Sequence, residues 1–548
     1  MKHDKEKNIK NRYFKRTAVG LLTAMLVMSL CACSSDTAGN TADTAGQVQS
    51  ETDSDTDQII ENTDSASEEA ADESDAGKNG SDAKNDNDAE NDNDAENDSD
   101  AENGRPGNPP GEPPQGGPDG NGGPGGKGGP DGNGGPGGSF GGSGDIEYSG
   151  AEEITSGDSQ SSLTYTSSTA DESALLIATD EEVAITDPTV TKTGDSDGGD
   201  NCNFYGLNAA VLVKDGSDTT ITGGTVTSEA DGANGIFCYG GNGGQNGAEG
   251  DGTTVTIRDT VIKTTGDGSG GIMTTGGGTT YAYDLDVTTG GRSSAAIRTD
   301  RGGGTVVVDG GTYTTSGLGS PAIYSTADIT VSNAVLTSNL SEGVCIEGLN
   351  SITLNDCDLT ADNTKQNGNA TFLDTIMIYQ SMSGDADSGT SHFTMTGGSL
   401  TSKSGHVFHV TNTNAVITLE NVEISNEDSD NILLSVCDDG WDGAENEATV
   451  NASAQTLSGA VLVGSNSTLT MNLTNGSSFE GYVDGKITNA NGETVSTEAG
   501  TVSVTLDSTS TWTLTGDSYV TEFNGDAANV VSNGYTLYVN GTALTGTK

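Results

Sequence analysis

The chain has 548 residues, a formal net charge of −59 and 81 glycines, and only 31% of its residues are hydrophobic. A negative charge of this size repels phosphate, so we expect no nucleic-acid partner. A uniform chain of this composition would not fold, so the residues able to form a core must be concentrated in one part of the sequence.

Residues 1 to 32 have the features of an export signal. A basic stretch that includes Lys10 and Arg16 leads into an apolar run, Thr17 to Ala32, which is too short for a comfortable membrane span. The run ends in Leu30-Cys31-Ala32-Cys33 and resembles the bacterial lipobox. The resemblance implies a lipid on Cys33 of an exported protein, held at the extracellular face of the cell membrane by lipid alone. An ordinary secretory signal with two unrelated cysteines is the alternative.

Residues 33 to 148 have the composition of a linker. From Ser34 to about Gly104 there is almost no large apolar residue, and the acidic motif Asn-Asp-Asn-Asp-Ala-Glu occurs at 85–90 and again at 91–96. Glycine and proline dominate residues 105 to 144. Such tracts bury too little apolar surface to offset the entropy of ordering. We therefore predict a disordered acidic stalk followed by a flexible Gly/Pro-rich segment, with weak calcium binding by the acids as the alternative.

A short unit repeats along residues 149 to 548. It reads apolar, Thr, apolar, any residue, a two-residue turn, any residue, apolar, in the copies that begin at Ile329, Ile352, Phe393 and Ile417. The first two apolar positions alternate and so point to one side of a strand, and a turn pair such as Asn333-Ala334 then bends the chain. The equivalent residues Tyr313, Leu336 and Leu359 are 23 positions apart, which is about one coil of a three-sided solenoid.

These features predict an all-β fold, a right-handed parallel β-helix, across residues 149 to 548, with the stretches 149–200 and 500–548 as terminal caps. No segment has the length and period of an amphipathic helix. The region from about 200 to 480 resembles the pectin-lyase-like parallel β-helix proteins, and the C-terminal stretch with Trp512 and Tyr535 resembles the end of uncharacterised bacterial surface β-helix proteins. That fold hosts lyases, hydrolases, adhesins and binding modules, so the resemblance alone selects no activity.

A further strand precedes each repeat and supplies the candidate binding residues. It begins at Ile236, Ile272, Ile297, Ile323, Ile346 and Ile378. If each isoleucine points inward, the residue after it points outward and stacks with its neighbours about 4.8 Å apart. The expected exposed column is Phe237, Met273, Arg298, Tyr324, Glu347 and Tyr379, with Tyr239 and Asp300 two residues further along the same face. Rings, acids and a guanidinium suit an extended polysaccharide, and some β-helix relatives bind plant-wall polysaccharide in this manner; a plain solvated sheet face is the alternative.

Enzymatic motifs are sparse. A polygalacturonase-like site would need several clustered aspartates, and Asp438-Asp439 is the only matching pair in the repeats. A calcium-dependent uronate lyase would need a basic residue beside acids on an exposed face, for which Arg298, Asp300 and Arg301 are the best candidates. A solvated loop that pairs with nearby carboxylates is the alternative, and we expect binding without catalysis.

Metal and thiol signals are weak. Oxygen ligands of the kind that calcium prefers occur at Asp195, Asp197, Asp200, Asp438, Asp439 and Asp442, without a defined motif. We therefore expect no cofactor, with calcium left open. His406 and His409 have an odd spacing, which in a regular strand places them on opposite faces. The five cysteines after residue 200 are widely spaced and are expected to be small core residues without disulfides.

The sequence thus predicts a lipid-anchored cell-surface protein for adhesion or polysaccharide binding. Its partner would be a polysaccharide or the surface of a host or neighbouring cell. A calcium-dependent uronate lyase and a purely structural surface protein are the two alternatives.

Overall fold

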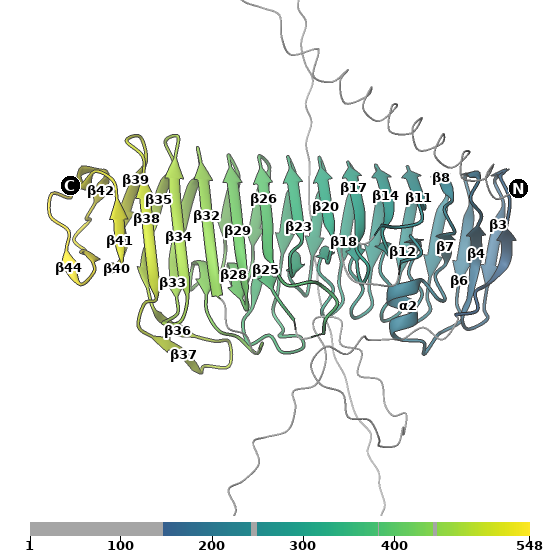
Figure 1. Ribbon diagram of the computed structural model, residues 1–548, viewed down its shortest axis with the longest axis horizontal. Helices are drawn as coiled ribbons and strands as arrows, with labels where there is room; N and C mark the ends of the chain where they lie inside the picture. The colour runs from purple at the N-terminus through teal and green to yellow at the C-terminus, as the bar shows by residue number, and fades with distance from the viewer. Residues whose placement is uncertain (1–145, 243–248, 382, 442–445) are drawn as a thin grey trace, which may run out of the picture. The chain divides into compact units, whose positions relative to one another are not determined.

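The computed structural model describes residues 146–242, 249–381, 383–441 and 446–548. Three long sheets, all parallel, dominate this part of the chain, and successive coils pass through sheet A, sheet B and sheet C in turn (Figure 1). Sheet A has 15 strands, sheet B has 14 and sheet C has 10. The predicted parallel β-helix is therefore confirmed.

The strands have the following bounds. Sheet A contains β1 (Ser149–Ile154), β4 (Glu172–Ala178), β7 (Val211–Lys214), β10 (Ile236–Tyr239), β13 (Ile272–Thr275), β16 (Ile297–Thr299), β19 (Ile323–Ser325), β22 (Val344–Glu347), β25 (Asp374–Tyr379), β28 (His406–Thr411), β31 (Ile432–Val436), β33 (Thr456–Val463), β35 (Ser478–Asp484), β39 (Thr511–Leu514) and β42 (Val530–Val531). Sheet B contains β2 (Asp158–Ser161), β5 (Glu182–Thr186), β8 (Asp218–Thr222), β11 (Thr254–Arg258), β14 (Gly278–Tyr283), β17 (Gly304–Asp309), β20 (Asp328–Ser332), β23 (Ser351–Asn355), β26 (Thr390–Thr396), β29 (Thr413–Glu420), β32 (Asn446–Ser453), β34 (Thr468–Thr474), β38 (Thr501–Leu506) and β41 (Glu522–Asn524). Sheet C contains β3 (Thr164–Ser167), β6 (Thr189–Lys192), β9 (Thr225–Ser228), β12 (Val261–Thr264), β15 (Asp286–Thr289), β18 (Thr312–Thr315), β21 (Val335–Ser338), β24 (Asp358–Ala361), β27 (Ser399–Ser402) and β30 (Glu423–Asn426).

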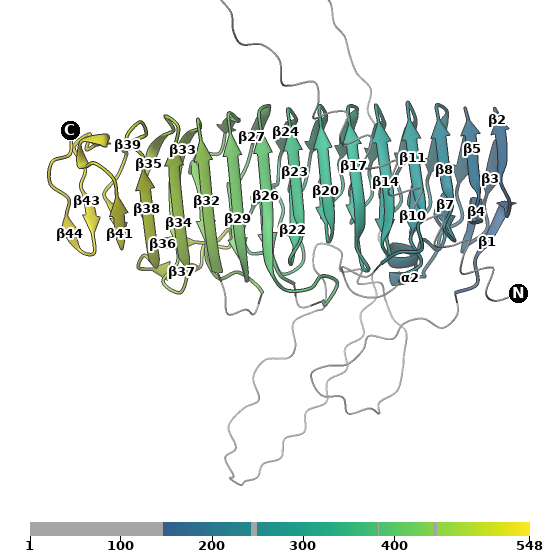
Figure 2. The ribbon, with the colours of Figure 1, turned by 45° about the horizontal axis from the view of Figure 1, so that its top comes forward.

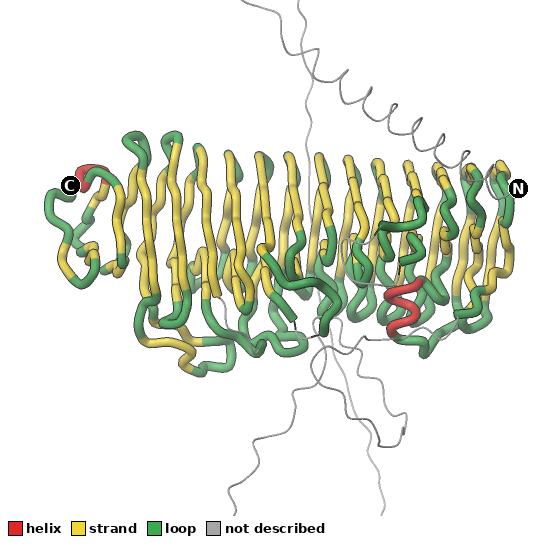
Figure 3. The backbone as a smooth tube through the Cα atoms, in the orientation of Figure 1, coloured by secondary structure: helices red, strands yellow, loops and turns green. Residues whose placement is uncertain are grey.

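Five short strands and two short helices complete the part of the fold that the structure describes. They are the antiparallel pair β36 (Lys486–Thr488) and β37 (Thr494–Thr497), the small sheet of β40 (Ser518–Val520), β43 (Leu537–Val539) and β44 (Thr542–Ala543), helix α2 (Asp200–Tyr205) and the 3-10 helix η1 (Ala527–Asn529). Figure 3 shows that α2 and the longer loops gather along one side of the solenoid, opposite the short turns. Of the helices in the described part of the chain, none is long and apolar enough to span a membrane.

The turn pairs of the repeat connect sheet B to sheet C. Their first residues lie in the left-handed region, with φ of 55° at Asn333, 50° at Asp356 and 53° at Asn421. Asparagine and aspartate tolerate this conformation better than other residues with a Cβ. The pattern of turn residues in the sequence thus reflects a corner that every coil must form.

The core lies inside the three sheets. Tyr313, Leu336 and Leu359 are in register on neighbouring strands of sheet C, as the repeat predicted. All three are fully buried in one continuous apolar cluster. Because such residues stack on both neighbouring coils, each is removed from water on both sides. Each large aliphatic side chain buried in this way stabilises the folded state by about 1.5–3 kcal/mol.

The two ends differ from the predicted caps. Strands β1 to β6, within the predicted N-terminal cap, are themselves in-register coils of the solenoid (Figure 2). Helix α2 follows them and was not predicted, because six residues are too few to show a helical period. At the other end, sheets A and B continue after sheet C stops at β30, and the small sheet β40-β43-β44 follows.

Candidate functional site

The predicted column lies on the outer side of sheet A, with one error of register. Phe237, Met273, Arg298 and Tyr324 are aligned on consecutive strands, as expected. Tyr324 then pairs with Cys345, because Ile323 aligns with Val344 and not with Ile346. Glu347 and Tyr379 align with each other, two residues further along their strands.

The expectation that this column is exposed is wrong. Phe237, Arg298, Tyr324, Glu347 and Tyr379 are each 0–1% exposed, and only Tyr239 is half-buried. Residues that contact the column come from α2 and from the loops 362–373, 380–389 (of which residue 382 lies outside the described residues) and 437–441; they include Tyr205, Ala370, Ser381 and Trp441. At one end the ring of Tyr205 in α2 meets that of Tyr239 edge-on at 5.8 Å, and at the other Trp441 packs on Tyr379 at 5.1 Å. An extended polymer therefore cannot lie on this column.

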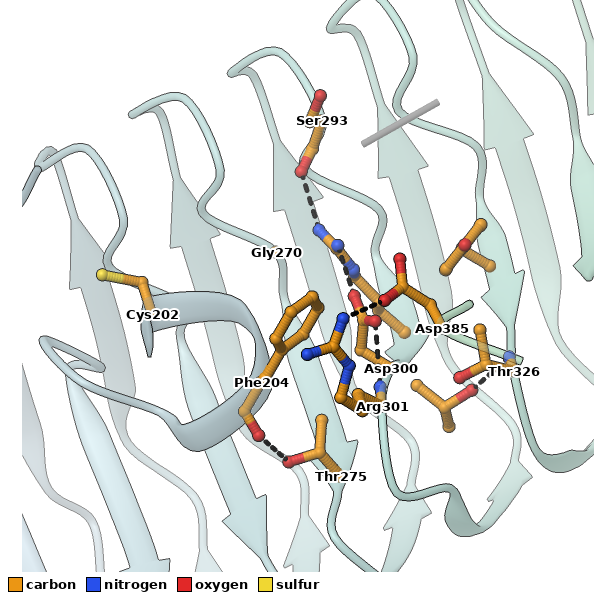
Figure 4. Close-up of polar contacts among 12 residues, drawn as sticks. Cys202, Phe204, Gly270, Thr275, Ser293, Asp300, Arg301, Thr326 and Asp385 are labelled. Atoms are coloured by element: carbon orange, nitrogen blue, oxygen red, sulfur yellow. Dashed lines mark hydrogen bonds and ion pairs between the residues drawn. The ribbon is translucent and has the colours of Figure 1, made fainter. Parts of the chain in front are cut away.

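The three residues of the suggested lyase site lie together under this cover. A terminal nitrogen of Arg298 is 2.6 Å from a carboxylate oxygen of Asp300, and its other terminal nitrogen donates to the carbonyl of Ser293 at 3.1 Å. Arg301 turns away to pair with Asp385 at 2.6 Å (Figure 4). Arg298 and Asp300 are each 1% exposed, so in this arrangement neither can touch a polymer.

Arg301 contacts both α2 and the loop 380–389, two of the segments that cover the column. Its guanidinium lies 4.1 Å from the ring centre of Phe204 in α2, while it pairs with Asp385 in the loop 380–389. Burial raises the pKa of Asp200 at the start of α2, and the positive charge of Arg301 offsets part of that rise. Thr275 adds a hydrogen bond to the carbonyl of Phe204 at 2.7 Å, which fastens α2 to sheet A (Figure 4).

Glu347 is a buried carboxylate surrounded by hydroxyl groups. One oxygen accepts from the hydroxyls of Tyr324 at 2.5 Å and Tyr379 at 3.2 Å. The other accepts from Ser381, and from Ser383 at 3.3 Å. These hydrogen bonds compensate for the loss of water around a buried charge. The network therefore holds the loop 380–389 onto the sheet.

A second polar cluster on sheet A was missed by the sequence reasoning. Ser435 Oγ lies 2.7 Å from Nδ1 of both His406 and His409, and His409 Nε2 lies 3.4 Å from Asp439 Oδ2. The two histidines share one side of the sheet because Val407 and Phe408 between them both face the core, which breaks the alternation. The prediction of opposite faces is thus wrong.

This cluster is buried and fastens two loops. Thr371 donates to Asp439 through its backbone N–H at 2.7 Å and through its hydroxyl. Burial alone would raise the pKa of Asp439, but its interactions with His409 and Thr371 outweigh that effect and lower the pKa. Ser435 and His409 are fully buried, so the serine is not presented to a substrate. The cluster holds the loops 362–373 and 437–441 against the strands.

The weak calcium candidates are not brought together. Asp195 accepts the backbone N–H of Asp231, and Asp438 accepts the amide of Asn446, while Asp442 lies outside the described residues. Within the described ranges no group of three or more His, Cys, Asp or Glu side chains is placed to hold a metal ion. The five cysteines of the described solenoid are buried, as predicted; they are Cys202, Cys238, Cys345, Cys357 and Cys437.

The exposed face that the sequence reasoning passed over is the outer face of sheet B. Tyr281 and Tyr283 both point outward from β14, because the residue between them, Ala282, is buried in the core. Both rings are partly exposed. The guanidinium of Arg258 on β11 lies over the ring of Tyr283 at 3.9 Å. The signal in the sequence was the alternation Tyr-Ala-Tyr, which places two rings on one side of a strand.

Hydroxyl and amide side chains extend this face along the solenoid. A partly exposed column in register with Tyr281 consists of Thr220, Thr256, Thr330, Thr353, Thr394, Thr418, Asn451, Asn472 and Thr505, interrupted by Val307. Two hollows open beside the column. One of about 630 Å³ lies over β2, β5 and β8 and includes Glu182 and Asp218. The other, of about 400 Å³, lies where the chain enters β26 and β29.

Comparison of the whole chain with protein-family models, with curated proteins and with solved structures finds no match.

Proposed function

We propose that this protein binds polysaccharide at the cell surface, through the outer face of sheet B. The observation that carries the proposal is the pair Tyr281 and Tyr283, partly exposed beside Arg258, with Tyr281 in a column of mostly hydroxyl and amide side chains. Aromatic rings present an apolar face and a polar tip, which suits a ligand with C–H faces and hydroxyls. Neighbouring strands repeat these groups about every 4.8 Å, so a polymer along the solenoid axis would meet them in series.

Charge favours a polymer that carries no negative groups of its own. Asp309 and Asp328 are exposed acids on this face, and the whole chain has a net charge of −59. A polyuronate would be repelled by such a field. The uronate-lyase alternative also needs an accessible base, and the buried Arg298 gives it no support.

The cell-surface location is the part of the proposal that depends on the sequence alone. Lipidation at Cys33 and a stalk over residues 33 to 148 would display the solenoid away from the membrane, for adhesion to polysaccharide on a host or neighbouring cell. Both segments lie outside the described residues. The three all-parallel sheets support the relationship to pectin-lyase-like proteins, which we retain as a proposal.

Retention of the purified protein on insoluble glucan, xylan and mannan tests this function. The double variant Tyr281→Ala/Tyr283→Ala should lose roughly tenfold or more in affinity, since each ring contributes about 1 kcal/mol through stacking. Tyr535→Ala is the matched control, because Tyr535 is 43% exposed and lies far along the chain from β14. The proposal fails if the parent binds none of these polymers, or if the double variant binds as tightly as the control.

A further inference from the structure

The smaller hollow at the entrance to β26 and β29 has a lining without ionisable groups. Its volume is about 400 Å³, and its polar side chains include Gln380, Ser388, Thr390, Asn412 and Asn414. Ligand pockets of proteins commonly enclose about 300–1,000 Å³. The hollow is therefore large enough for a small ligand and offers it only amides and hydroxyls.

One part of this lining is held rigidly. The side-chain amide of Asn412 donates to the backbone carbonyl of Gln380 at 2.7 Å, and the backbone N–H of Asn412 donates to Asn446 at 2.7 Å. Gln380 in turn donates to the carbonyl of Ala386 at 3.2 Å. These bonds join the loop 380–389 to the start of β29. The shape of the hollow is thus preorganised.

The other polar side chains of the lining are available to hydrogen-bond a ligand. Within the part of the chain that the structure describes, the side chains of Ser388, Thr390 and Asn414 form no hydrogen bond with another residue. Thr390 and Asn414 are in register on adjacent strands, so their side chains stand side by side at about 4.8 Å. Together with Ser388 they offer two hydroxyls and an amide to a ligand, and no hydrogen bond within the protein has to break.

An apolar side chain completes the rim. Leu349 is 44% exposed. It lies against the backbone of Gly389 in the lining, where an added Cβ would come within 2.4 Å of the Cβ of Leu349. A sugar ring has hydroxyls at its edge and C–H groups on its faces, so this pairing of a polar floor with an apolar rim fits it. The exposed side chain of Leu349 would then pack on the apolar face of the sugar.

We infer that this hollow is a subsite for one neutral sugar residue of the bound polysaccharide, an inference that rests on the proposed function of sheet B. Amides and hydroxyls match sugar hydroxyls as donors and acceptors. Glu447 is exposed and in register with Asn414 on the next strand, so a carboxylate-bearing sugar would meet a like charge there. Along the solenoid axis the subsite lies four strand steps from Tyr281 in sheet B, about 19 Å at the usual strand spacing. It is also displaced along β26 by the four residues between Thr394, which is in register with Tyr281, and Thr390, about 13 Å, so one polymer that crosses the sheet obliquely can occupy both.

Calorimetric titration of the full protein with soluble cello-, xylo- and mannohexaose tests the inference. Thr390→Val and Asn414→Ala should each weaken binding roughly 3- to 10-fold, the loss expected when one neutral hydrogen bond of about 0.5–1.5 kcal/mol is removed. Thr468→Val is the matched control, since Thr468 aligns with Glu447 in the same row of sheet B and is also partly exposed. It should bind within twofold of the parent. Thermal unfolding of each variant verifies that the fold is intact.

The outcomes separate the subsite from the function. If Thr390→Val and Asn414→Ala bind like the parent while the Tyr281/Tyr283 double variant loses retention, the subsite is overturned and the proposed function stands. If the parent binds none of the three hexasaccharides or their polymers, both are overturned. Tighter binding of oligogalacturonate than of the neutral hexasaccharides would overturn the assignment to a neutral sugar.

Discussion

Arg301, in the turn between β16 and β17, pairs with Asp385, which lies 84 residues later in the loop between β25 and β26. Their nitrogen and oxygen are 2.6 Å apart, and each side chain is 16% exposed. Because Arg301 also stacks on Phe204, this pair connects α2, sheet A and the loop 380–389. The nearby Arg298–Asp300 pair is buried, and the guanidinium of Arg298 lies 5.5 Å from the ring centre of Tyr324, which donates to Glu347.

Removal of the Arg301 side chain should destabilise the packing of α2 and of the loop 380–389 on sheet A. We expect Arg301→Ala to lower the free energy of unfolding by about 1–3 kcal/mol, because it leaves the largely buried carboxylate of Asp385 without its partner. Amide hydrogen exchange should rise in α2 and in the loop 380–389, while the sheet C strands keep their protection. Arg258→Ala, at an exposed arginine on sheet B, is the control. Unchanged exchange in α2 would contradict the role assigned to Arg301.

His406 should make the fold sensitive to acid. Burial, together with the nearby His409, lowers the pKa of His406 to about 3. An unfolded histidine has a pKa of about 6.5. Between these two values the unfolded chain binds a proton that the folded chain does not, so stability falls as the pH falls, by about 1.4 kcal/mol per pH unit for this group.

Urea denaturation at intervals from pH 7 to pH 4 measures this slope. His406→Asn should remove its part of the pH dependence, while His392→Asn, at an exposed histidine of β26, should retain the parental slope. Equal slopes for parent and His406→Asn would show that another group is responsible.

Substitutions at two adjacent residues compare the effect on stability of an inward-facing and an outward-facing side chain of one coil. Leu336 is fully buried and Val335 beside it is 45% exposed, both in β21. Leu336→Ala should cost about 2–5 kcal/mol, because it leaves a cavity in the continuous core. Val335→Ala should change stability by less than about 0.5 kcal/mol. Similar losses for the two variants in chemical denaturation would refute the register.

The anchor is tested on the mature protein from a bacterial host. Lipidation at Cys33 predicts a mature chain that begins at this residue, carries the mass of a diacylglyceryl group and fractionates with membranes. Cys33→Ser should move the protein to the soluble fraction, since no other lipid site is expected. An unmodified, soluble parent chain would show that the Leu30–Cys33 motif belongs to an ordinary secretory signal.

The sequence by itself determined the coil and its interior. Alternation within a strand and the turn after it are local properties, so Ile329, Val331 and Leu336 could be placed inside from their spacing alone. The 23-residue period then aligned Leu336 with Leu359, as the structure confirms. The register failed at β22, because Val344 and Ile346 are both apolar and a period of two cannot distinguish a shift of two residues.

Only the tertiary structure decided which faces meet solvent. The pattern showed correctly that Arg298 and Tyr324 leave the interior of the coil, but their burial depends on loops that fold back from far along the chain, such as the one that carries Asp385. On sheet B the same alternation placed Tyr281 and Tyr283 outside, and no described loop covers them. Strand periodicity encodes the side on which a residue lies; whether that side is covered depends on long-range contacts that no local pattern records.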